Sequence, residues 1–319
     1  MLVLAGCGLR EFENEFSSMS TYVKITAYAR RAPAWDALHR ATAEWVRQLD
    51  HRVEGSATAI LNEKGMLPAG SEGEALLRAV LADAVRAAAR TEGAYDPTIL
   101  PVVRLWDFDD GGRLPSPEAL ASAVSLVDYT TVRVTGALAL APGQQVDLGG
   151  VGKGAVVDLV ADHLAGQGIE RFLVEAGGDL LVAGLKPGER PWRIWIQHPR
   201  TPEAALAILE IGAAGERRAV VTSGDYERYL EVDGVRYHHI LDPKTGWPAR
   251  RSVSVTVISA RAAEADALAT GLFVAGPAGL PWFDGDAGVQ ALVVTETDGE
   301  LRAHATADFP VPVGELNLN

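Results

Sequence analysis

The stretch VDLGGVGKGAVVDLVADHL, residues 146–164, constrains the fold more than any other part of the sequence. Four glycines surround Lys153, and an amphipathic helical pattern follows them directly. A glycine-rich turn at a helix N-terminus leaves backbone N–H groups free to point at an anion, and a lysine beside them adds positive charge. The pattern therefore predicts an anion-binding loop and helix. The alternative is a turn whose glycines serve only the geometry of the chain.

Neither of the two standard phosphate loops fits this stretch. A Walker-A loop needs Gly and Ser or Thr where this chain has Asp147 and Gly154. A loose dinucleotide fingerprint is satisfied by the glycines, and Glu175 lies where a ribose-binding acid would be. However, the preceding residues PGQQVD are polar, whereas a buried parallel strand is a continuous apolar run. The sequence thus favours an anion site outside both standard folds.

The overall charge of the chain argues against some classes of binding partner. The chain has 319 residues and a net charge of -13, so nucleic acid and anionic membrane surfaces, which need concentrated Lys and Arg, are not expected as partners. Its length is typical of one large or two medium domains. The single cysteine excludes an internal disulfide.

That cysteine lies in an N-terminal pattern typical of bacterial lipoproteins. Leu4 to Cys7 read Leu-Ala-Gly-Cys, a lipobox in which the cysteine would carry the lipid, although only six residues precede it and a full signal needs a longer apolar region. We expect residues 1–18 to be the remnant of a lipoprotein signal followed by a linker. Either the signal has lost its beginning or the start codon is assigned too far downstream. Residues 19–319 are expected to form the functional domain. The alternative is an ordinary buried cysteine. No other stretch approaches the ~20 apolar residues of a membrane span.

Periodicity predicts an α+β fold. Helical spacing indicates helices within residues 32–54, 72–93 and 116–129, the last with Ser116 as cap and Pro117 at the first position. Strands are expected at 171–175, 192–197 and 251–260, and Asp-Gly pairs at 233–234 and 298–299 indicate hairpins. Strands that pair through hairpins, with helices in separate blocks, favour α+β over a doubly wound sheet.

Four further segments break this periodicity with acids, glycines and histidines: EAGGDL (175–180), VTSGDYERY (221–229), YHHILDPKTGWP (237–248) and EADALATGLFVAG (264–276). In the third, His238 and His239 would lie on opposite faces of a strand. In the last, Asp266 and Thr270 are four residues apart and stack their oxygens on one helical face. Each segment alone is explained by turns, a core histidine or a carboxylate near a helix start. Together with the glycine loop, these four segments contain more small and acidic residues than turns alone require, so we expect a functional site.

These segments, in order with MSTYVKI (19–25), GAYDPTILPVVRLWDF (93–108) and VDLGGVGKGAVVD (146–158), resemble the ApbE family of FAD:protein FMN transferases. The resemblance extends from about Met19 to Phe273. It implies an α+β fold of two T-fold-like halves, with mixed or antiparallel sheets and packed helices. It also implies a periplasmic, magnesium-dependent enzyme, anchored to the inner membrane through a lipid on Cys7.

The reaction implied by the resemblance splits FAD and attaches FMN to a Thr or Ser hydroxyl of a partner flavoprotein, typically a subunit of a membrane redox complex, with release of AMP. FAD is then a substrate and Mg²⁺ the cofactor. Phosphoryl transfer depends on positioning and charge neutralisation, and hard oxygen ligands suit the metal. The glycine loop would face the FAD pyrophosphate, with Lys153 as the cation beside it.

Residue roles follow from the same resemblance. Asp266 and Thr270 would ligate the metal together with the backbone carbonyl of Gly152. His239 is the first candidate for the catalytic base and Asp242 the second, with Lys153 also assigned to catalysis. The residues expected to bind FAD are Met19, Asn62, Tyr95, Asp96, Lys153, Glu175, Gly177, Ser223, Gly224 and Thr245.

This sequence departs from the family pattern at three positions. Ser20 stands where Gly is frequent, Gly152 where Ala is usual, and Glu175 where Asn or Ser is frequent. Two other functions remain open at this point: an FAD pyrophosphatase with the same site, for which the position of Asn62 matters, and a flavin-carrying lipoprotein without turnover. A carrier would need neither a metal clamp nor a base.

Overall fold

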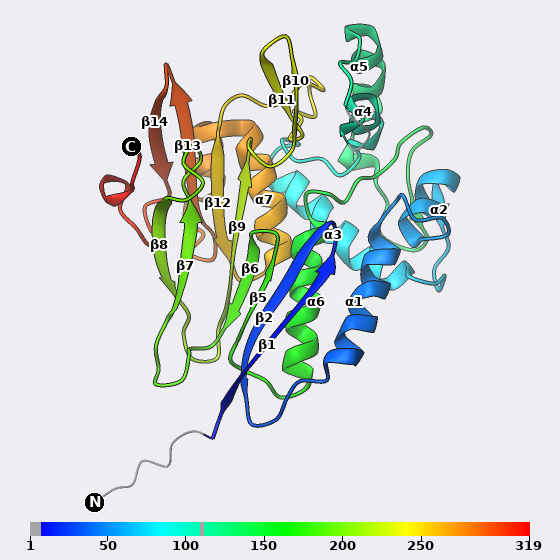
Figure 1. The fold of residues 1–319 in the computed structure, drawn as a ribbon. Helices are drawn as coiled ribbons and strands as arrows, with labels where there is room; N and C mark the ends of the chain where they lie inside the picture. Colours follow the sequence, from blue (N-terminus) through cyan, green and yellow to red (C-terminus); the bar gives the residue numbers. More distant parts are fainter. Residues whose placement is uncertain (1–7, 109–111) are drawn as a thin grey trace, which may run out of the picture.

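The computed structural model describes residues 8–108 and 112–319, and its centre is one eight-stranded sheet (Figure 1). The strand order is β1-β2-β5-β6-β9-β12-β13-β14, and every neighbouring pair is antiparallel. The strands are β1 (Arg10–Ser18), β2 (Thr21–Ala29), β5 (Phe172–Ala176), β6 (Asp179–Ala183), β9 (Arg217–Gly224), β12 (Ser254–Ser259), β13 (Gln290–Thr297) and β14 (Glu300–Ala305).

The sheet divides into two halves of four strands. The first half holds β1, β2, β5 and β6, with helix α6 (Gly152–Gly166) directly before its last two strands. The second half holds β9, β12, β13 and β14, with α7 (Ala262–Ala275) directly before its last two strands. This arrangement confirms the predicted α+β fold. The stretch before the glycine loop forms no parallel sheet strand, so a dinucleotide fold is excluded for the described residues.

Helices cover one face of the sheet (Figure 1). α6, α7 and α1 (Trp35–Leu49) contact the sheet, and α2 (Ala57–Lys64) and α3 (Glu74–Arg90) pack on the outer side of these helices. Alternate strand residues such as Val174 and Val257 point into the large apolar core between these helices and the sheet. α7 is nearly all apolar because it packs against α3, α6 and the strands β9 and β12.

The opposite face of the second half is covered by a two-stranded ribbon, β7 (Trp192–Gln197) and β8 (Ala205–Ile211) (Figure 1). Trp192 and Ile194 point into a second apolar core, while the intervening Arg193 is exposed. The C-terminal tail lies along β8, where the N–H of Asn317 donates to the Leu206 carbonyl at 3.0 Å.

A third, smaller core stands at one end of the sheet (Figure 1). It is formed by α4 (Leu100–Trp106), α5 (Pro117–Val124), β10 (Tyr229–Val232) and β11 (Val235–His238). The Trp106 ring packs against Phe108, Tyr237 and Trp247, and its Nε1–H donates to the Gly246 carbonyl at 2.8 Å. The remaining short elements are β3 (Met66–Leu67), β4 (Leu138–Ala139) and 3-10 helices at Tyr129–Thr131, Gly276–Phe283 and Val313–Glu315.

The structure confirms the predicted helix cap and the predicted hairpin turns, which depend on residue types with strong local preferences. Ser116 Oγ accepts the Ala119 N–H at 3.2 Å, so it caps α5 as expected. Both Asp-Gly hairpins form, with positive φ at Asp233, Gly234, Asp298 and Gly299, as two-residue I′ turns require. Helices α2 and α4 have no counterpart among the predicted elements.

The N-terminal boundary lies elsewhere than expected. Residues 10–18, assigned above to the signal remnant and linker, form the edge strand β1 and pair with β2 along their whole length. Phe12 and Phe16 on this strand pack against the main core, so β1 belongs to the folded domain. Cys7 lies outside the described residues. Within the described part of the chain, no helix has the length and apolar character needed to cross a membrane.

Candidate functional site

The glycine loop and α7 meet at a point where only glycine fits. A Cβ on Gly154 would lie 2.2 Å from the backbone oxygen of Ala262, so α6 and α7 approach closely here. At the same place the Gly154 N–H donates to Oδ2 of Asp266 at 3.1 Å. Two segments more than 100 residues apart in the sequence are therefore in direct contact here.

Lys153 lies between two buried carboxylates at this contact. Its Nζ forms an ion pair with Oδ2 of Asp179 and lies 3.9 Å from Oδ1 of Asp266. Asp179 is 1% exposed and Asp266 3% exposed. Burial opposes the charge on Lys153, but the two carboxylates outweigh it and raise the pKa of the ammonium. Burial also raises the pKa of Asp179. Lys153 thus carries a firmly held positive charge beside the loop.

Gly150, and not Gly152, is the loop glycine that lies beside Thr270. A Cβ on Gly150 would be 3.1 Å from Thr270 Oγ1 and 3.1 Å from Cε2 of Tyr95. Gly152 is the first residue of α6, two positions before the contact between Gly154 and Asp266. Its carbonyl stays the predicted backbone ligand of the metal.

The oxygen atoms around this point suit a small, hard cation. The Asp266 carboxylate, the Thr270 hydroxyl and the loop carbonyl are the donor types that Mg²⁺ prefers. The buried hydroxyl of Tyr95 makes no hydrogen bond to any described residue, so one polar atom at the site has a free bonding position. Burial and the nearby carboxylates of Asp266 and Asp147 raise the pKa of Tyr95 well above its usual value, which keeps the phenol protonated.

Three or more His, Cys, Asp or Glu side chains do not gather into a metal-binding group anywhere in residues 8–108 and 112–319. A ligand set at this site would therefore rely on one or two carboxylates, a hydroxyl, a backbone carbonyl and oxygens of the substrate. Mg²⁺ usually keeps such a mixed shell, so the donors fit this ion better than Zn²⁺.

Two turns of the first half border the site. Met19 and Ser20 form the β1–β2 turn with φ of 52° and 59°, a left-handed conformation that glycine adopts more readily than serine. The β5–β6 turn packs against it, because a Cβ on Gly177 would lie 3.1 Å from the Thr21 side chain. Glu175 is half-buried on β5, two residues before this turn. Asp179, the partner of Lys153, begins the next strand.

The two adjacent histidines have different environments. Nε2 of buried His238 donates to the Ala249 carbonyl at 2.6 Å, its Nδ1 accepts the Ile240 N–H at 3.3 Å, and burial lowers its pKa. His239 follows β11 and donates from Nδ1 to the Arg228 carbonyl at 3.2 Å. Its Nε2 makes no hydrogen bond to a described residue, and burial lowers its pKa to about 4. His239 is thus the histidine that can accept a proton.

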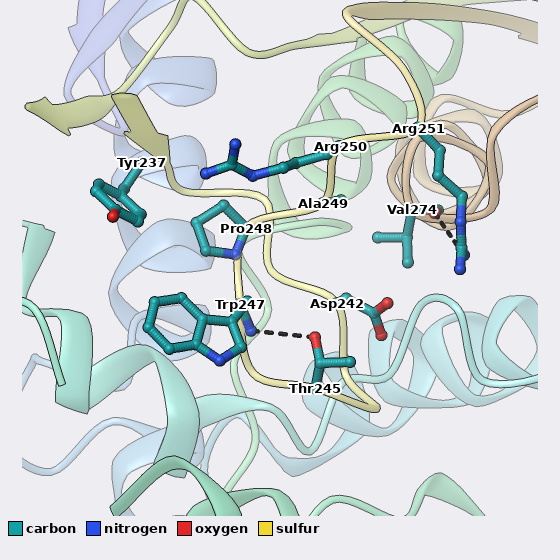
Figure 2. Close-up of a pocket in the computed structure, with 9 residues that line it drawn as sticks. All are labelled: Tyr237, Asp242, Thr245, Trp247, Pro248, Ala249, Arg250, Arg251 and Val274. Carbon is teal, nitrogen blue, oxygen red and sulfur yellow. Dashed lines mark hydrogen bonds between the residues drawn. The ribbon is translucent and has the colours of Figure 1, made fainter. Parts of the chain in front are cut away.

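A recess of about 420 Å³ lies beside the segment that follows the histidines (Figure 2). Asp266, Thr270 and Val274 follow one another at four-residue spacing on α7, so the helix face that carries the first two continues to the recess. Asp242 Oδ1 accepts the Lys244 N–H at 2.8 Å, and Thr245 Oγ1 accepts the Trp247 N–H at 3.3 Å. The lining residues are Tyr237, Asp242, Thr245, Trp247, Pro248, Ala249, Arg250, Arg251 and Val274.

Asn62 and Asp96, two residues predicted to bind FAD, form hydrogen bonds within the chain. Asn62 donates to the Val146 carbonyl at 2.8 Å and accepts the Val146 N–H at 2.7 Å, so its side chain holds the strand-like segment before the glycine loop. Asp96 accepts from the N–H and the hydroxyl of Thr98 and from the Tyr129 N–H. Both side chains position the segments that border the site.

Ser223 and Gly224 end β9 next to β12. A Cβ on Gly224 would lie 2.4 Å from the Tyr226 ring, which therefore covers this glycine. The prediction that Ser223 and Gly224 bind FAD stays a prediction.

Two residues near the site received no role from the sequence: Asp179 and Asp158. Asp179 lies in the EAGGDL segment and Asp158 ends the VDLGGVGKGAVVD segment, so both were inside recognised motifs. Their roles depend on partners at other positions, which the spacing of residues within one motif does not indicate. Asp158 looks like an ordinary residue of an amphipathic helix.

Comparison with known proteins gives the same picture. The ApbE family model matches residues 19–293. The FAD:protein FMN transferase of Vibrio cholerae is 39% identical over 237 residues, covering 72% of this chain and 70% of that protein. The FAD:protein FMN transferase of Treponema pallidum is 32% identical over 305 residues, covering 86% of this chain and 82% of that protein.

Solved structures agree in fold along nearly the whole chain. The flavin transferase ApbE from Vibrio cholerae superposes with a TM-score of 0.80 and 31% identity, covering 94% of this chain and 98% of that one. The ApbE protein of Thermotoga maritima gives a TM-score of 0.77 and 32% identity, covering 89% and 94%. With the family model matched over most of its length and with these relatives, the chain belongs to the ApbE family.

Proposed function

We propose that this protein transfers FMN from FAD to a hydroxyl of a partner flavoprotein, in a reaction that requires Mg²⁺. The observation that carries the proposal is the convergence of the glycine loop, Lys153 and Asp266 at one point. This point combines the N-terminus of α6, a fixed positive charge and a hard oxygen ligand. Such a combination suits a pyrophosphate that must be held and cleaved.

Lys153 would lie beside the pyrophosphate of FAD. Its ammonium is already oriented by Asp179, so little rearrangement is needed when the substrate arrives. The start of α6 adds the favourable end of the helix dipole. Together these groups neutralise part of the charge on the phosphates and fix their position, which supplies most of the catalysis in phosphoryl transfer.

Asp266 Oδ1, Thr270 Oγ1 and the Gly152 carbonyl would hold Mg²⁺. The ion would supply further neutralisation of charge on the phosphate oxygens. Oδ2 of Asp266 is held by the Gly154 N–H, which leaves Oδ1 for the metal. The Tyr95 hydroxyl is placed to donate to an oxygen bound at the same position.

His239 would take the proton of the incoming hydroxyl through Nε2. The hydroxyl oxygen forms a new bond to the phosphorus of the FMN half, and the bond from that phosphorus to the bridging oxygen breaks. AMP leaves with the bridging oxygen and the electron pair of the broken bond. The low pKa of His239 keeps its ring neutral, and hence able to accept the proton, at neutral pH.

The aromatic recess would hold a planar ring of FAD. Trp247 and Tyr237 offer flat apolar surfaces, and Arg250 and Arg251 offer positive charge (Figure 2). The recess continues the face of α7 that carries Asp266 and Thr270, so a dinucleotide could extend from one to the other.

The cellular setting is also part of the proposal. The Leu-Ala-Gly-Cys pattern supports lipidation at Cys7, an inner-membrane anchor and a periplasmic location. The acceptor would then be a subunit of a membrane redox complex. Mass spectrometry of the native protein tests the anchor, since an unmodified Cys7 in the cytoplasm would contradict it.

The transfer reaction is tested by mixing the protein with FAD, Mg²⁺ and a flavin-acceptor domain. We expect the acceptor to gain the mass of FMN, AMP to appear in equal amount, and both to disappear when EDTA is added. An acceptor with its target hydroxyl residue replaced by Ala is the control. Free FMN and AMP without a labelled acceptor would indicate a pyrophosphatase, and intact FAD would indicate a carrier.

Substrate selectivity gives a second test. Because the proposed site holds the pyrophosphate, FAD should bind more tightly than riboflavin in a fluorescence titration. Equal affinities would contradict the role given to the glycine loop and Lys153.

A further inference from the structure

Asp158, on α6, bonds to the start of α7. Its Oδ1 accepts the Ala262 N–H at 2.8 Å and its Oδ2 accepts the Ala263 N–H at 3.1 Å. α7 has no cap from its own N-cap residue, Arg261, so the carboxylate of another helix fills that place. Asp158 is 7% exposed, and both of its oxygens are used.

A bond in the opposite direction connects the same two helices. Asp266 of α7 accepts the N–H of Gly154, in the first turn of α6. Each helix therefore gives one carboxylate to the first turn of the other. We call this pair of interactions, made by Asp158 and Asp266, the carboxylate exchange. The close approach of Gly154 and Ala262 lies between the two bonds.

The outer side of the exchange is tied to a third helix. Arg261 Nε lies 3.5 Å from Asp158 Oδ2, and its guanidinium binds the Asp83 carboxylate of α3 with contacts of 3.1 and 2.9 Å. Shifting or rotating α7 along α6 would break these contacts together. Asp158 thus fixes the position of α7 in two directions.

We propose that Asp158 is a positioning residue for the metal site, because it sets the register between the two helices whose residues form that site. The proposed ligands come from both sides of the contact: Gly152 from the start of α6, and Asp266 and Thr270 from α7. Without Asp158, α7 can shift relative to the loop. A displacement of about 1 Å in a catalytic constellation can cost ~10²-fold in rate. Asp158 itself has no oxygen left to touch substrate or metal.

The inference rests on the proposed magnesium site, and the test keeps the two separate. In Asp158→Asn the side-chain volume is kept, but one acceptor oxygen becomes an amide that cannot accept the second N–H. Mg²⁺ is titrated in the presence of FAD and followed by the rise in the thermal unfolding midpoint. FAD binding without metal is followed by flavin fluorescence, and transfer is followed at each Mg²⁺ concentration.

We expect Asp158→Asn to fold and to bind FAD in EDTA nearly as the wild type does. The Mg²⁺ concentration that gives half of the maximal rise in the unfolding midpoint should increase about tenfold. This is the lower end of the loss in metal affinity when a residue that orients a metal ligand is mutated. The half-saturating Mg²⁺ concentration for transfer should rise in parallel, and high Mg²⁺ should recover much of the maximal rate. A purely structural role would lower the unfolding midpoint and leave both Mg²⁺ half-points unchanged.

Asp162→Asn is the matched control, since Asp162 lies one turn further along α6, is 65% exposed and pairs with Arg217. It removes the same charge without touching α7, so its Mg²⁺ dependence should equal that of the wild type. If Asp158→Asn does not fold, Arg261→Gln loosens the same contact from its exposed side and should raise the Mg²⁺ half-point by a smaller factor.

The outcomes separate two failures. If wild-type protein shows no thermal shift with Mg²⁺, the proposed metal site is wrong. If the wild type shifts and Asp158→Asn, or Arg261→Gln in its place, shifts at the same Mg²⁺ concentration, the positioning role is wrong. Equal effects of Asp158→Asn and Asp162→Asn would also overturn it, because they would reflect lost charge alone.

Discussion

Asp158 and Asp266, the two residues of the carboxylate exchange, differ in how many of their oxygens accept backbone hydrogen bonds. Both Asp158 oxygens accept backbone N–H groups, whereas Asp266 uses one oxygen for Gly154 and turns the other toward Lys153. The adjacent histidines show the same difference, since both ring nitrogens of His238 are bonded and only one of His239 is. In each pair, the fully bonded member fixes the backbone and the partly bonded member is available for chemistry.

The largest effect should come from replacing the partly bonded histidine. In His239→Ala the proton acceptor is lost while the FAD contacts remain, so transfer should slow by about 10²–10⁴-fold with FAD still bound. His238→Ala should lower stability but change the rate far less. Single-turnover labelling of the acceptor and FAD titrations measure both. If the two variants lose activity equally, or His239→Ala does not bind FAD, the role of base passes to Asp242.

The next largest effect is expected at Asp266. Asp266→Asn keeps the shape and the bond from Gly154 but removes the negative charge, so transfer should fall by about 100-fold and recover partly at high Mg²⁺. Thr270→Val should give a milder defect of the same kind. Activity is measured against Mg²⁺ concentration, with circular dichroism as the check on folding. If Asp266→Asn has the same magnesium dependence as the wild type, Asp266 does not bind the metal and serves only to hold the two helices together.

A third prediction concerns the contact between the two helices. Gly154→Ala places a Cβ 2.2 Å from the Ala262 oxygen, so it should reduce the free energy of unfolding by about 1–3 kcal/mol and disturb the metal site. Gly166→Ala, at the other end of α6, meets nothing within 4 Å and should be neutral or slightly stabilising. Urea unfolding of both variants makes the comparison. Equal stabilities would show that α6 and α7 separate at no cost.

The smallest effect is the pH dependence due to His238. Burial holds its folded-state pKa below the unfolded value of about 6.5, so below that pH the unfolded chain binds more protons and the folded state loses stability. The contribution is fully present above pH 6.5 and declines as the pH falls toward the folded-state pKa. We expect His238→Gln to lose less stability than the wild type between pH 7.5 and pH 5 in urea titrations. Parallel curves would show that His238 is not held neutral by the fold.

Features coded by neighbouring residues were predictable from the sequence. The loop and α6, the Ser116 cap, the Asp-Gly hairpins and the spacing of Asp266 and Thr270 all depend on residues within a few positions of one another. The α+β class followed from the same local patterns. Such features form because each residue type has its preferred backbone geometry wherever it occurs.

Features that depend on distant partners could not be predicted in this way. The pairing of Lys153 with Asp179, of Asp158 with Ala262 and of Asn62 with Val146 requires the register between elements, which the packed core sets. Strand β1 was missed because its alternation of Glu and Phe is short and adjoins the expected signal.

Strand β1 has a consequence for where the reaction can take place. Its nine residues span about 30 Å, and its far end is the Met19–Ser20 turn beside the site. Cys7 precedes Arg10 by three residues, a tether of at most ~10 Å. In the proposed lipid-anchored form, this short tether and the strand would limit the distance between the active site and the bilayer to about 40 Å. An acceptor would then have to present its hydroxyl within that distance of the membrane.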